Sequence, residues 1–199
     1  MAFNHIRRAC KPNDRRFTLD TTVEQIKKLV RVSDFDLDAA AEELSHVAPV
    51  WYGPGGAAED GLETPWFGHV FCNPPWSQKG LWAAKGWREM DASRTSSIAM
   101  LLPATTDQAW WHEYVEPRRG IKFLSPSNTP YVFDVHFLPG RPRYGCPEDP
   151  TGAMSVCSVC EGAPMRDIEN RGCPKCGGTG LTPQSSPPFG SCVLVWATA

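Results

Sequence analysis

The sequence predicts an α/β fold in which a parallel sheet is followed by antiparallel strands and interrupted by a small cysteine-rich insert. Two mostly apolar stretches, residues 69–72 and 96–102, are typical of buried strands, and each precedes a segment with helical periodicity. Later, apolar and polar residues alternate along residues 131–137, as in a half-buried strand. Because strand and helix alternate first, we expect a parallel sheet whose ligand site lies at the carboxyl ends of its strands.

Length and composition indicate one domain with enough apolar residues for a single core. The chain has 199 residues, of which 41% are hydrophobic, and a net charge of −2. No apolar run is long enough to span a bilayer, and residues 1–8 lack the apolar stretch of a secretory signal. We therefore expect a soluble, cytoplasmic protein with no membrane partner.

Charge is unevenly distributed along the chain. Residues 32–78 contain eight acidic residues and neither lysine nor arginine. This segment suits a cationic or diol-bearing ligand, whereas the remaining 14 acidic and 20 basic residues leave positive charge for phosphate contacts. The net charge argues against a nonspecific nucleic-acid coat protein. A solvated acidic surface is the alternative explanation of the acidic segment.

Residues 1–31 are expected to form a basic arm followed by a helix. The arm, residues 1–16, is polar and contains five basic residues, which suits contact with DNA. Thr21 and Glu24 have the spacing of a capping box and predict the start of the helix. The apolar stripe of this helix consists of Val23, Ile26, Leu29 and Val30.

The first half of the sheet begins with a short strand at residues 35–37. This strand ends at the small residues 39–41, which predict a strand-to-helix junction where the backbone approaches a ligand. Residues 49–60 are rich in glycine and proline and are expected to form a loop. The elements expected next are the strand 69–72, a helix over residues 81–90, the strand 96–102, and a helix that Thr106 caps and that runs to Tyr114.

The second half of the chain has an antiparallel character. Residues 121–124 and 131–137 are expected to be strands, and the apolar run 191–196 is expected to be the last core strand. Residues 146–186, which separate the last two of these strands, have few large apolar side chains. A segment of this length with so few large apolar side chains cannot hold a core without a metal or other cross-link.

The cysteines of this segment form two CxxC pairs. Cys157 with Cys160 and Cys173 with Cys176 are separated by 12 residues, and glycine follows each pair closely. Four thiolates without a redox or haem signature favour tetrahedral structural Zn²⁺, and a closed Cys₄ shell leaves no open position for catalysis. Two disulfides or a thioredoxin-like pair are the alternatives. We therefore expect residues 146–186 to form a zinc-ribbon-like insert.

The strongest chemical signal is the motif Asn73, Pro74, Pro75 and Trp76 at the end of the strand 69–72. The Asn73 oxygen and the Pro74 carbonyl can each accept one hydrogen of an exocyclic NH₂ group, while the Trp76 indole stacks on the attached ring. Accepting both hydrogens draws the nitrogen lone pair out of conjugation, and the prolines hold the acceptors in place. The motif predicts N-methylation of a planar amine. A Pro-Pro turn closed by a core tryptophan is the alternative.

Taken together, these residues resemble the Dam-like DNA N6-adenine methyltransferases found in phages and prophages. The resemblance covers most of residues 17–145 and 187–197 in the order of the family. The matching stretches are residues 35–41, 60–66, 70–76, 100–104, 106–107, 111–112, 137–145 and 188–195.

The resemblance implies a compact Rossmann-like methyltransferase core over residues 32–145 and 187–199. It implies transfer of a methyl group from S-adenosylmethionine to N6 of adenine in DNA, in the cytoplasm of a bacterial host cell if the gene is carried by a phage or prophage. The target base then has to flip out of the duplex to reach the motif at residues 73–76. The residues expected to contact the cofactor are Asp36 or Asp38, Ala39 and Asp60.

Four arginines are the candidates for DNA contact. Arg141 and Arg143 alternate on one face of an extended segment, and Arg118 and Arg119 come next; exposure to solvent alone is the alternative for all four.

Two other functions remain open from the sequence. The same motif serves methyltransferases that act on guanine in RNA or on a glutamine amide in protein, and an inactive methyltransferase core with a zinc ribbon would act as a DNA-binding adaptor.

Overall fold

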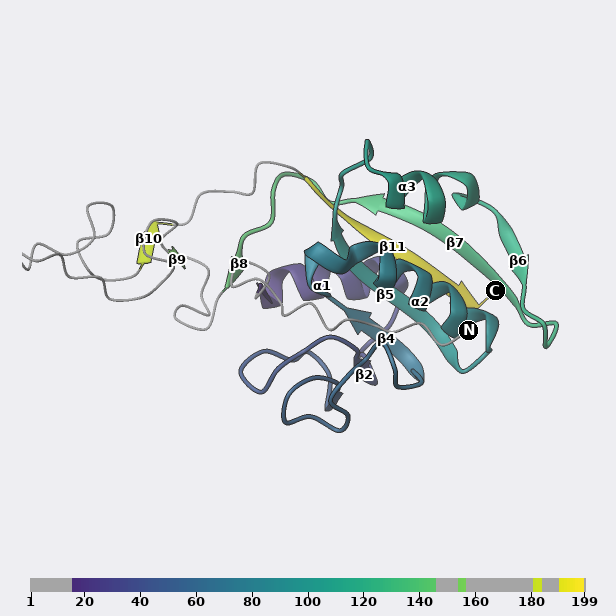
Figure 1. Cartoon of the computed structure of the whole chain (residues 1–199), viewed down its shortest axis with the longest axis horizontal. Helices are drawn as coiled ribbons and strands as arrows, with labels where there is room; N and C mark the ends of the chain where they lie inside the picture. Colours follow the sequence, from purple (N-terminus) through teal and green to yellow (C-terminus); the bar gives the residue numbers. More distant parts are fainter. Residues whose placement is uncertain (1–15, 146–153, 157–180, 184–189, 199) are drawn as a thin grey trace, which may run out of the picture.

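The computed structural model describes residues 16–145, 154–156, 181–183 and 190–198 (Figure 1). In this part of the chain, a mixed seven-stranded sheet has the order β3-β2-β4-β5-β11-β7-β6. Its strands are β2 (Leu37–Asp38), β3 (Val50–Trp51), β4 (Gly68–Cys72), β5 (Thr95–Pro103), β6 (Lys122–Leu124), β7 (Pro130–Phe137) and β11 (Ser191–Thr198). The helices are α1 (Asp20–Val30), α2 (Lys79–Asp91) and α3 (Ala109–Tyr114), with short 3-10 helices η2 (Trp76–Gln78) and η3 (Glu116–Arg118).

The sheet is parallel on one side and antiparallel on the other. β3, β2, β4 and β5 run parallel, with Asp38 opposite Phe71 and Cys72 opposite Met100. β11 is antiparallel to both β5 and β7, so β7 runs in the same direction as β5. The carboxyl ends of β2, β4, β5 and β7 therefore lie at one edge of the sheet. The predicted change from parallel to antiparallel pairing along the chain is confirmed.

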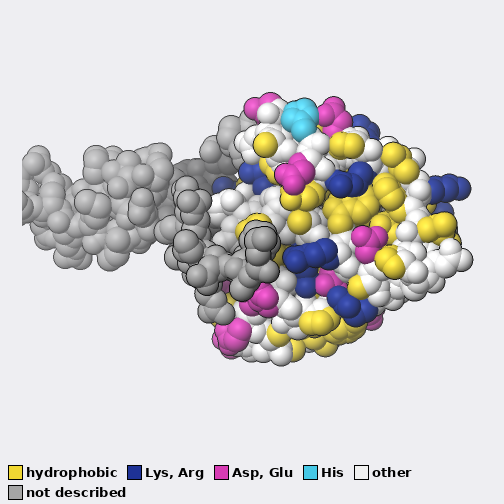
Figure 2. All heavy atoms as spheres, turned by 45° about the vertical axis from the view of Figure 1, so that its right-hand side comes forward, with side chains coloured by type: hydrophobic (Ala, Val, Ile, Leu, Met, Phe, Trp, Pro, Cys, Tyr) yellow, Lys and Arg dark blue, Asp and Glu magenta, His cyan; other side chains and the backbone are white. Residues whose placement is uncertain are grey.

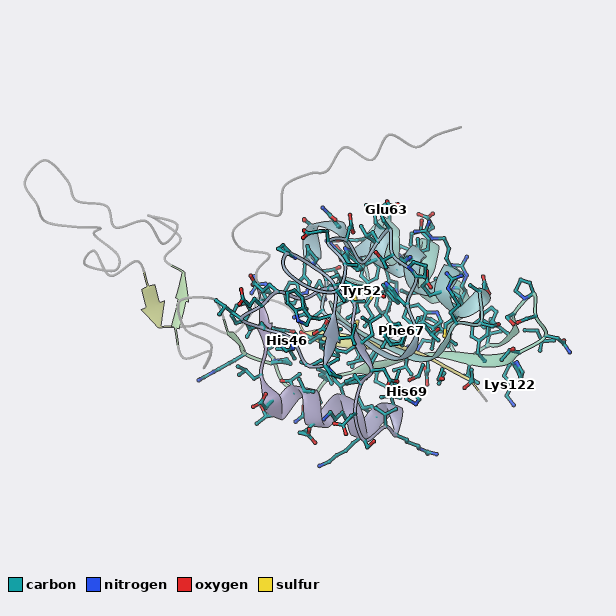
Figure 3. All side chains as sticks on the ribbon, turned by 90° about the horizontal axis from the view of Figure 1, so that it is seen from below. His46, Tyr52, Glu63, Phe67, His69 and Lys122 are labelled. Atoms are coloured by element: carbon teal, nitrogen blue, oxygen red, sulfur yellow. The ribbon has the colours of Figure 1, made fainter. Side chains whose placement is uncertain are left out.

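Helices cover both faces of this sheet. Figure 3 shows α1 on one side of it and α2 on the other. Trp87 of α2 packs against Phe133 of β7 and Trp196 of β11, with ring centroids 4.7 and 5.5 Å apart. β5 lies between β4 and β11, and residues 98–102 are completely buried. A strand covered on both faces reads as a continuous apolar run, which is why the sequence identified β5.

Two predicted helix starts differ from the structure. α1 begins at Asp20, after Leu19, so Thr21 lies within the helix and no side chain caps it. The Leu19 carbonyl accepts hydrogen bonds from the amides of Thr22 and Val23, so the helix starts without the capping box. Similarly, α3 begins at Ala109 after Gln108, and the predicted cap at Thr106 is wrong.

The helix expected after residues 39–41 is also absent from the described structure. The Ala39 amide donates to the Phe71 carbonyl and the Ala41 amide to the Tyr52 carbonyl, and the chain bends at residues 39 and 40. These bonds tie the segment to the neighbouring backbone, and the described chain forms no helix at this point. The chain then returns through turns to β3, which pairs in parallel with β2.

A short two-stranded sheet lies outside the central one. β1 (Phe17–Thr18) pairs antiparallel with β8 (Tyr144–Gly145), and Phe17 and Tyr144 are buried. A second small pair, β9 (Met154–Val156) with β10 (Leu181–Pro183), is also antiparallel. Within the described residues, no helix is both long and apolar enough to cross a membrane.

A buried ion pair fixes the loop that leads into β4. Glu89 of α2 is 2% exposed and lies 2.7 Å from Lys85 Nζ and 2.9 Å from an Arg94 guanidinium nitrogen. Its carboxylate also accepts a hydrogen bond from the Trp66 amide at 3.0 Å. Burial raises the pKa of Glu89, but these donors outweigh it and hold the pKa below its ordinary value. The charged network therefore anchors the segment that follows Asp60.

Candidate active site

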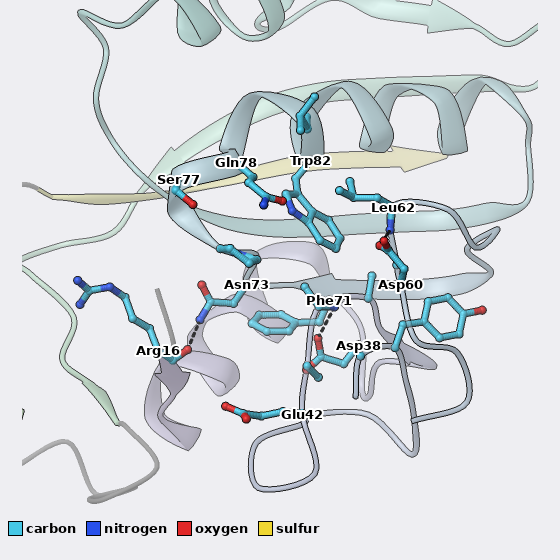
Figure 4. Close-up of a pocket in the computed structure, with 18 of the residues that line it drawn as sticks. Arg16, Asp38, Glu42, Asp60, Leu62, Phe71, Asn73, Ser77, Gln78 and Trp82 are labelled. Atoms are coloured by element: carbon cyan, nitrogen blue, oxygen red, sulfur yellow. Dashed lines mark hydrogen bonds between the residues drawn. The ribbon is translucent and has the colours of Figure 1, made fainter. Parts of the chain in front are cut away.

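A cavity of about 1100 Å³ lies at the carboxyl ends of β2 and β4 (Figure 4). Its walls come from the strands, from β1, from the loops that follow β2 and β3, and from α2 and α3. This is where the sequence predicted the ligand site of a parallel sheet. Single ligand sites commonly measure about 300–1,000 Å³. The cavity is therefore at the large end of the sizes seen for ligand sites.

Asn73 lies at the end of β4 with its amide oriented by β1. Its Nδ2 donates to the Arg16 carbonyl at 2.7 Å and to Thr18 Oγ1 at 2.9 Å. Because a carbonyl oxygen has no hydrogen to donate, this contact determines which end of the amide is nitrogen. Asn73 Oδ1 is buried and has no hydrogen-bond partner in the structure. In Figure 4 the dashed hydrogen bond to Arg16 leaves from the amide nitrogen, and the oxygen has no such bond.

Of the other three residues of the motif, only one lines the cavity. Pro75 lines the cavity, whereas Pro74 and Trp76 do not. Trp76 begins η2 and is 6% exposed, with the Arg16 guanidinium 4.4 Å from its ring centroid and Tyr144 packed edge-on at 5.2 Å. The open stacking face that the sequence predicted is thus covered by Arg16 in this structure.

Asp38 is the predicted cofactor residue that the structure places in the cavity wall beside Ala39. It is 3% exposed, and its carboxyl group accepts hydrogen bonds from the amides of Val47 at 3.1 Å and Ala40 at 3.4 Å. Burial raises the pKa of Asp38 to about 7, although the two amide donors act in the opposite direction. The group is therefore poised to change charge near neutral pH.

Asp60 and Asp36 take different positions. Asp60 also lines the cavity, where its Oδ1 accepts from the Leu62 amide at 2.9 Å. Asp36 is exposed and lies outside the cavity wall, and its Oδ2 accepts from the His69 amide at 2.7 Å near the beginning of β4. Of the two aspartates that flank Leu37, only Asp38 therefore faces the cavity.

Two glycines bring the loop after β3 against the segment that follows β2. A Cβ on Gly53 would lie 1.9 Å from the Ala41 carbonyl oxygen, and one on Gly61 would lie 1.9 Å from that of Ala39. Gly53 also has a φ of +143°, which side chains with a Cβ rarely adopt. The wall beside Ala39 thus depends on both glycines. The sequence had identified Gly53 only as a loop residue and Gly61 only as part of the stretch 60–66 that resembles the family.

Aromatic side chains complete the far end of the cavity. Tyr52 and Trp82 both line it, and Figure 4 shows Trp82 on the same side as Leu62. The Tyr52 hydroxyl donates to the Pro65 carbonyl at 2.9 Å. These rings give a planar ligand an apolar surface next to a carboxylate. Sequence reasoning missed both of them, and it also missed Thr18. No local pattern points to Thr18, which is 55 residues from Asn73 in the chain.

Two of the four candidate arginines are engaged with the protein itself. The Arg118 guanidinium lies 5.1 Å from the Trp87 ring centroid. That of Arg119 lies 5.6 Å from the Phe137 ring and 3.9 Å from a carboxylate oxygen of Asp134. On the face that Figure 2 presents, lysine and arginine side chains are scattered among apolar and acidic ones. This face does not form one continuous basic patch.

Arg141 and Arg143 lie in the segment between β7 and β8 and are both exposed. β7 ends at the same edge of the sheet as β4, and the Leu138 amide donates to the Ser191 carbonyl at that edge. The chain then reaches Tyr144, which packs on Trp76. The segment that carries these two arginines therefore leaves the sheet on the same side as the cavity.

The predicted zinc ligands Cys157, Cys160, Cys173 and Cys176 lie outside the described residues. Among the residues that the structure does describe, no group of three or more histidine, cysteine, aspartate or glutamate side chains is arranged to hold a metal. Cys72 at the end of β4 is a buried free thiol, and burial raises its pKa well above the ordinary value. A buried thiol of this kind is a poor nucleophile.

The family model described as DNA N-6-adenine-methyltransferase (Dam) matches residues 14–141. No curated protein matches the chain. The matched residues make up more than half of the 199-residue chain and include β1, Asp38 and the motif at Asn73. The chain therefore belongs to the Dam family of DNA N-6-adenine-methyltransferases.

Proposed function

We propose that the protein transfers the methyl group of S-adenosylmethionine to the N6 amine of an adenine that has flipped out of DNA. Membership of the Dam family implies DNA adenine N6-methylation in general. The observation that carries the finer proposal is Asn73 Oδ1, a buried acceptor without a partner. An unpaired buried acceptor costs free energy, which a bound N–H donor recovers.

In this proposal, Asn73 and the motif prepare the amine for attack. Asn73 Oδ1 accepts one hydrogen of the N6 amine, and the Pro74 carbonyl is the proposed second acceptor. These contacts draw the nitrogen lone pair toward the direction of attack and stabilise the positive charge that develops on nitrogen. Bound S-adenosylmethionine supplies an electrophilic methyl group on a sulfonium. The nitrogen gains the methyl group and loses one proton to solvent, while the sulfur keeps the bonding electrons as a thioether.

The chain has suitable groups for the cofactor in the same cavity. Asp38 and Ala39 are proposed to face its ribose hydroxyls or its ammonium group, and Asp60 its adenine amine. Asp38 already accepts two amide hydrogens, but a carboxylate has about four acceptor positions and can take another donor. The volume of about 1100 Å³ supports simultaneous occupation by cofactor and base.

A flipped adenine is proposed to stack on Trp76. Because the Arg16 guanidinium now covers that ring, one planar partner has to replace the other when the base enters. Extrusion of the base costs a few kcal/mol. Stacking on an aromatic side chain returns about 1–3 kcal/mol of this. Arg141 and Arg143 are the proposed phosphate contacts, because they leave the sheet on the cavity side.

We also propose that Cys157, Cys160, Cys173 and Cys176 bind one structural Zn²⁺. Their spacing and the closed set of four thiolates support this assignment. The module at residues 146–186 follows Arg141 and Arg143 directly in the chain, and it brings three further basic residues. Its proposed role is therefore to help recognise DNA and to take no part in the chemistry.

Transfer of a radiolabelled methyl group from S-adenosylmethionine tests the proposal, with DNA, RNA and protein offered in parallel. Asn73→Ala is expected to lower the rate of DNA methylation by about 10²–10³, because one preorganised contact to the transition state is lost. Cofactor affinity, measured by calorimetry, should stay close to that of the unmodified protein.

Gln25→Ala is the matched control, because it removes an exposed amide from α1. Near-normal turnover in Asn73→Ala would rule out the assignment of the motif. Methylation of RNA or protein in place of DNA would identify another substrate. Absence of any cofactor uptake would identify a binding protein.

A further inference from the structure

We propose that Thr18 is a positioning residue for methyl transfer, because its hydroxyl oxygen holds the Asn73 amide in the orientation that the reaction requires. The inference rests on the proposed function of Asn73. Thr18 is not part of the motif and belongs to β1. It acts through Asn73 and has no assigned contact with the substrate.

An asparagine side chain can present either of its ends to a ligand. Its oxygen and nitrogen differ little in size, but the oxygen accepts hydrogen bonds and the NH₂ group only donates them. Turned by 180°, Asn73 would present donors to an amine that also donates, and the contact would become repulsive. Methyl transfer therefore requires that the two orientations differ clearly in free energy.

β1 and the residue before it supply that difference with two acceptors. The Arg16 carbonyl and Thr18 Oγ1 each take one hydrogen of Asn73 Nδ2, at 2.7 and 2.9 Å. Rotation of the amide would break both bonds and point its oxygen at the carbonyl oxygen of Arg16. The backbone acceptor is present whatever residue stands at position 16, so the hydroxyl of Thr18 is the contribution that a side chain makes.

β1 is in turn fixed to the centre of the molecule. Thr18 pairs with Tyr144, whose hydroxyl shares a hydrogen bond of 2.8 Å with Ser191 Oγ in β11. Phe17 is 5% exposed and anchors the strand in the core. The acceptors of Arg16 and Thr18 are thus held against the same sheet whose strand β4 ends next to Asn73. A rigid second layer of this kind is what precise catalytic groups require.

Threonine is also a favourable strand residue, so an effect on stability has to be separated from an effect on orientation. Thr18→Val keeps the branched shape and removes the acceptor, whereas Thr18→Ser keeps the acceptor and removes the methyl group. We expect Thr18→Val to lower kcat for DNA methylation by about tenfold, which is the size of one lost hydrogen bond. Thr18→Ser should stay within about threefold of the unmodified protein, and neither variant should change cofactor affinity by more than about twofold.

A double-mutant cycle tests whether Thr18 acts through Asn73. In the Asn73→Ala background there is no amide to orient, so Thr18→Val should have no further effect on kcat. A further tenfold loss in that background would overturn the inference, because Thr18 would then act independently. A kcat of Thr18→Val within twofold of the unmodified protein would also overturn it. So would equal losses in Thr18→Val and Thr18→Ser.

The orientation can also be measured without turnover. The side-chain NH₂ signals of Asn73 in a ¹⁵N NMR spectrum are identified by their disappearance in Asn73→Ala. In Thr18→Val these hydrogens should exchange with solvent faster, and in Thr18→Ser they should exchange as in the unmodified protein. Unchanged exchange in Thr18→Val would contradict the inference. If the unmodified protein transfers no methyl group, the proposed function fails, and the exchange measurement alone then decides whether Thr18 holds the amide.

Discussion

Asp38 is a buried carboxyl group in the wall of the cavity, and its charge depends on pH near neutrality. Its raised pKa of about 7 means that the folded protein holds this proton more tightly than the unfolded chain does. The free energy of unfolding should therefore fall as pH rises from about 4 to about 7. A ligand that donates hydrogen bonds to the carboxylate favours the ionised form, and its binding should release a proton below pH 7.

This predicts a pH dependence of cofactor binding. The affinity for S-adenosylmethionine should increase as pH rises from 6 to 7 and level off above it, approaching a tenfold change per pH unit well below the pKa. Asp38→Asn should remove this dependence and weaken binding at pH 8 by about 1.5–3 kcal/mol, because a charged acceptor is lost. Calorimetry in buffers with different ionisation enthalpies measures both the affinity and the proton release.

Asp36→Asn is the control for this experiment, since Asp36 has the same chemistry two positions earlier and lies outside the cavity. It should bind the cofactor with the pH dependence of the unmodified protein. Loss of cofactor affinity in Asp36→Asn together with normal binding in Asp38→Asn would reverse the assignment of the two aspartates.

The two aspartates also illustrate how far sequence reasoning reaches at the residue scale. The pattern around Leu37 identified an acidic segment at a strand end, but it left Asp36 and Asp38 as alternatives because neither strand boundary was known. The structure separates them because β2 is only two residues long and ends at Asp38. Asn73 was identified from its own motif, whereas its partners Arg16 and Thr18 come from a distant part of the chain that no local pattern connects to it.

Among the elements of the fold, the segment between β7 and β8 joins the sheet to the candidate DNA surface. Arg141 and Arg143 lie on it, and both are exposed. The combined change of Arg141→Ala and Arg143→Ala should weaken DNA binding and lower the slope of log K against log salt by roughly 2, because about 0.9 of an ion is released for each phosphate contact. Anisotropy of a labelled duplex at several salt concentrations measures this slope.

Lys28→Ala and Lys122→Ala together remove the same charge from exposed positions on α1 and β6 and provide the control. They should leave most of the salt dependence in place. An unchanged slope in the double arginine variant would show that DNA binds elsewhere.

Element types were predicted better than element starts. Apolar stretches and the periodicity of apolar residues in the sequence identified β4, β5, β7, β11 and α2. The starts of α1 and α3 were misplaced, because the backbone and not a side chain closes their first turns. Residues 39–41 were expected to lead into a helix, since small residues often do so at ligand sites. Hydrogen bonds to Phe71 in β4 and to Tyr52 just after β3 hold the segment in a bent, non-helical conformation, and those partners are visible only in three dimensions.

At the scale of the whole molecule, the cysteine-rich segment is predicted to be separable from the catalytic core. Replacing Cys157 and Cys160 by serine should release zinc and lower DNA affinity or sequence selectivity, while the core still binds S-adenosylmethionine. A metal site with two of its four thiolates removed is not expected to retain zinc at ordinary concentrations. Elemental analysis measures the zinc content, and calorimetry on the same samples measures the binding of S-adenosylmethionine.

Cys10→Ser with Cys146→Ser is the matched control, because these cysteines lie outside the two CxxC pairs. Zinc content should not change in this variant. Unmodified protein without zinc would refute the metal site. Loss of cofactor binding and of folding in the Cys157/Cys160 variant would indicate instead that the segment stabilises the last strand.

The position of β11 in the sheet also determines which strand edges stay unpaired while the chain is being synthesised. β11 lies between β5 and β7, although the other six strands of this sheet precede it in the chain. In a nascent chain that ends before residue 191, β11 is missing. One edge of β5 and one edge of β7 are then unpaired. Such strand edges are templates for pairing with other chains. Until β11 has left the ribosome and paired, the nascent protein exposes strand edges that the finished sheet covers.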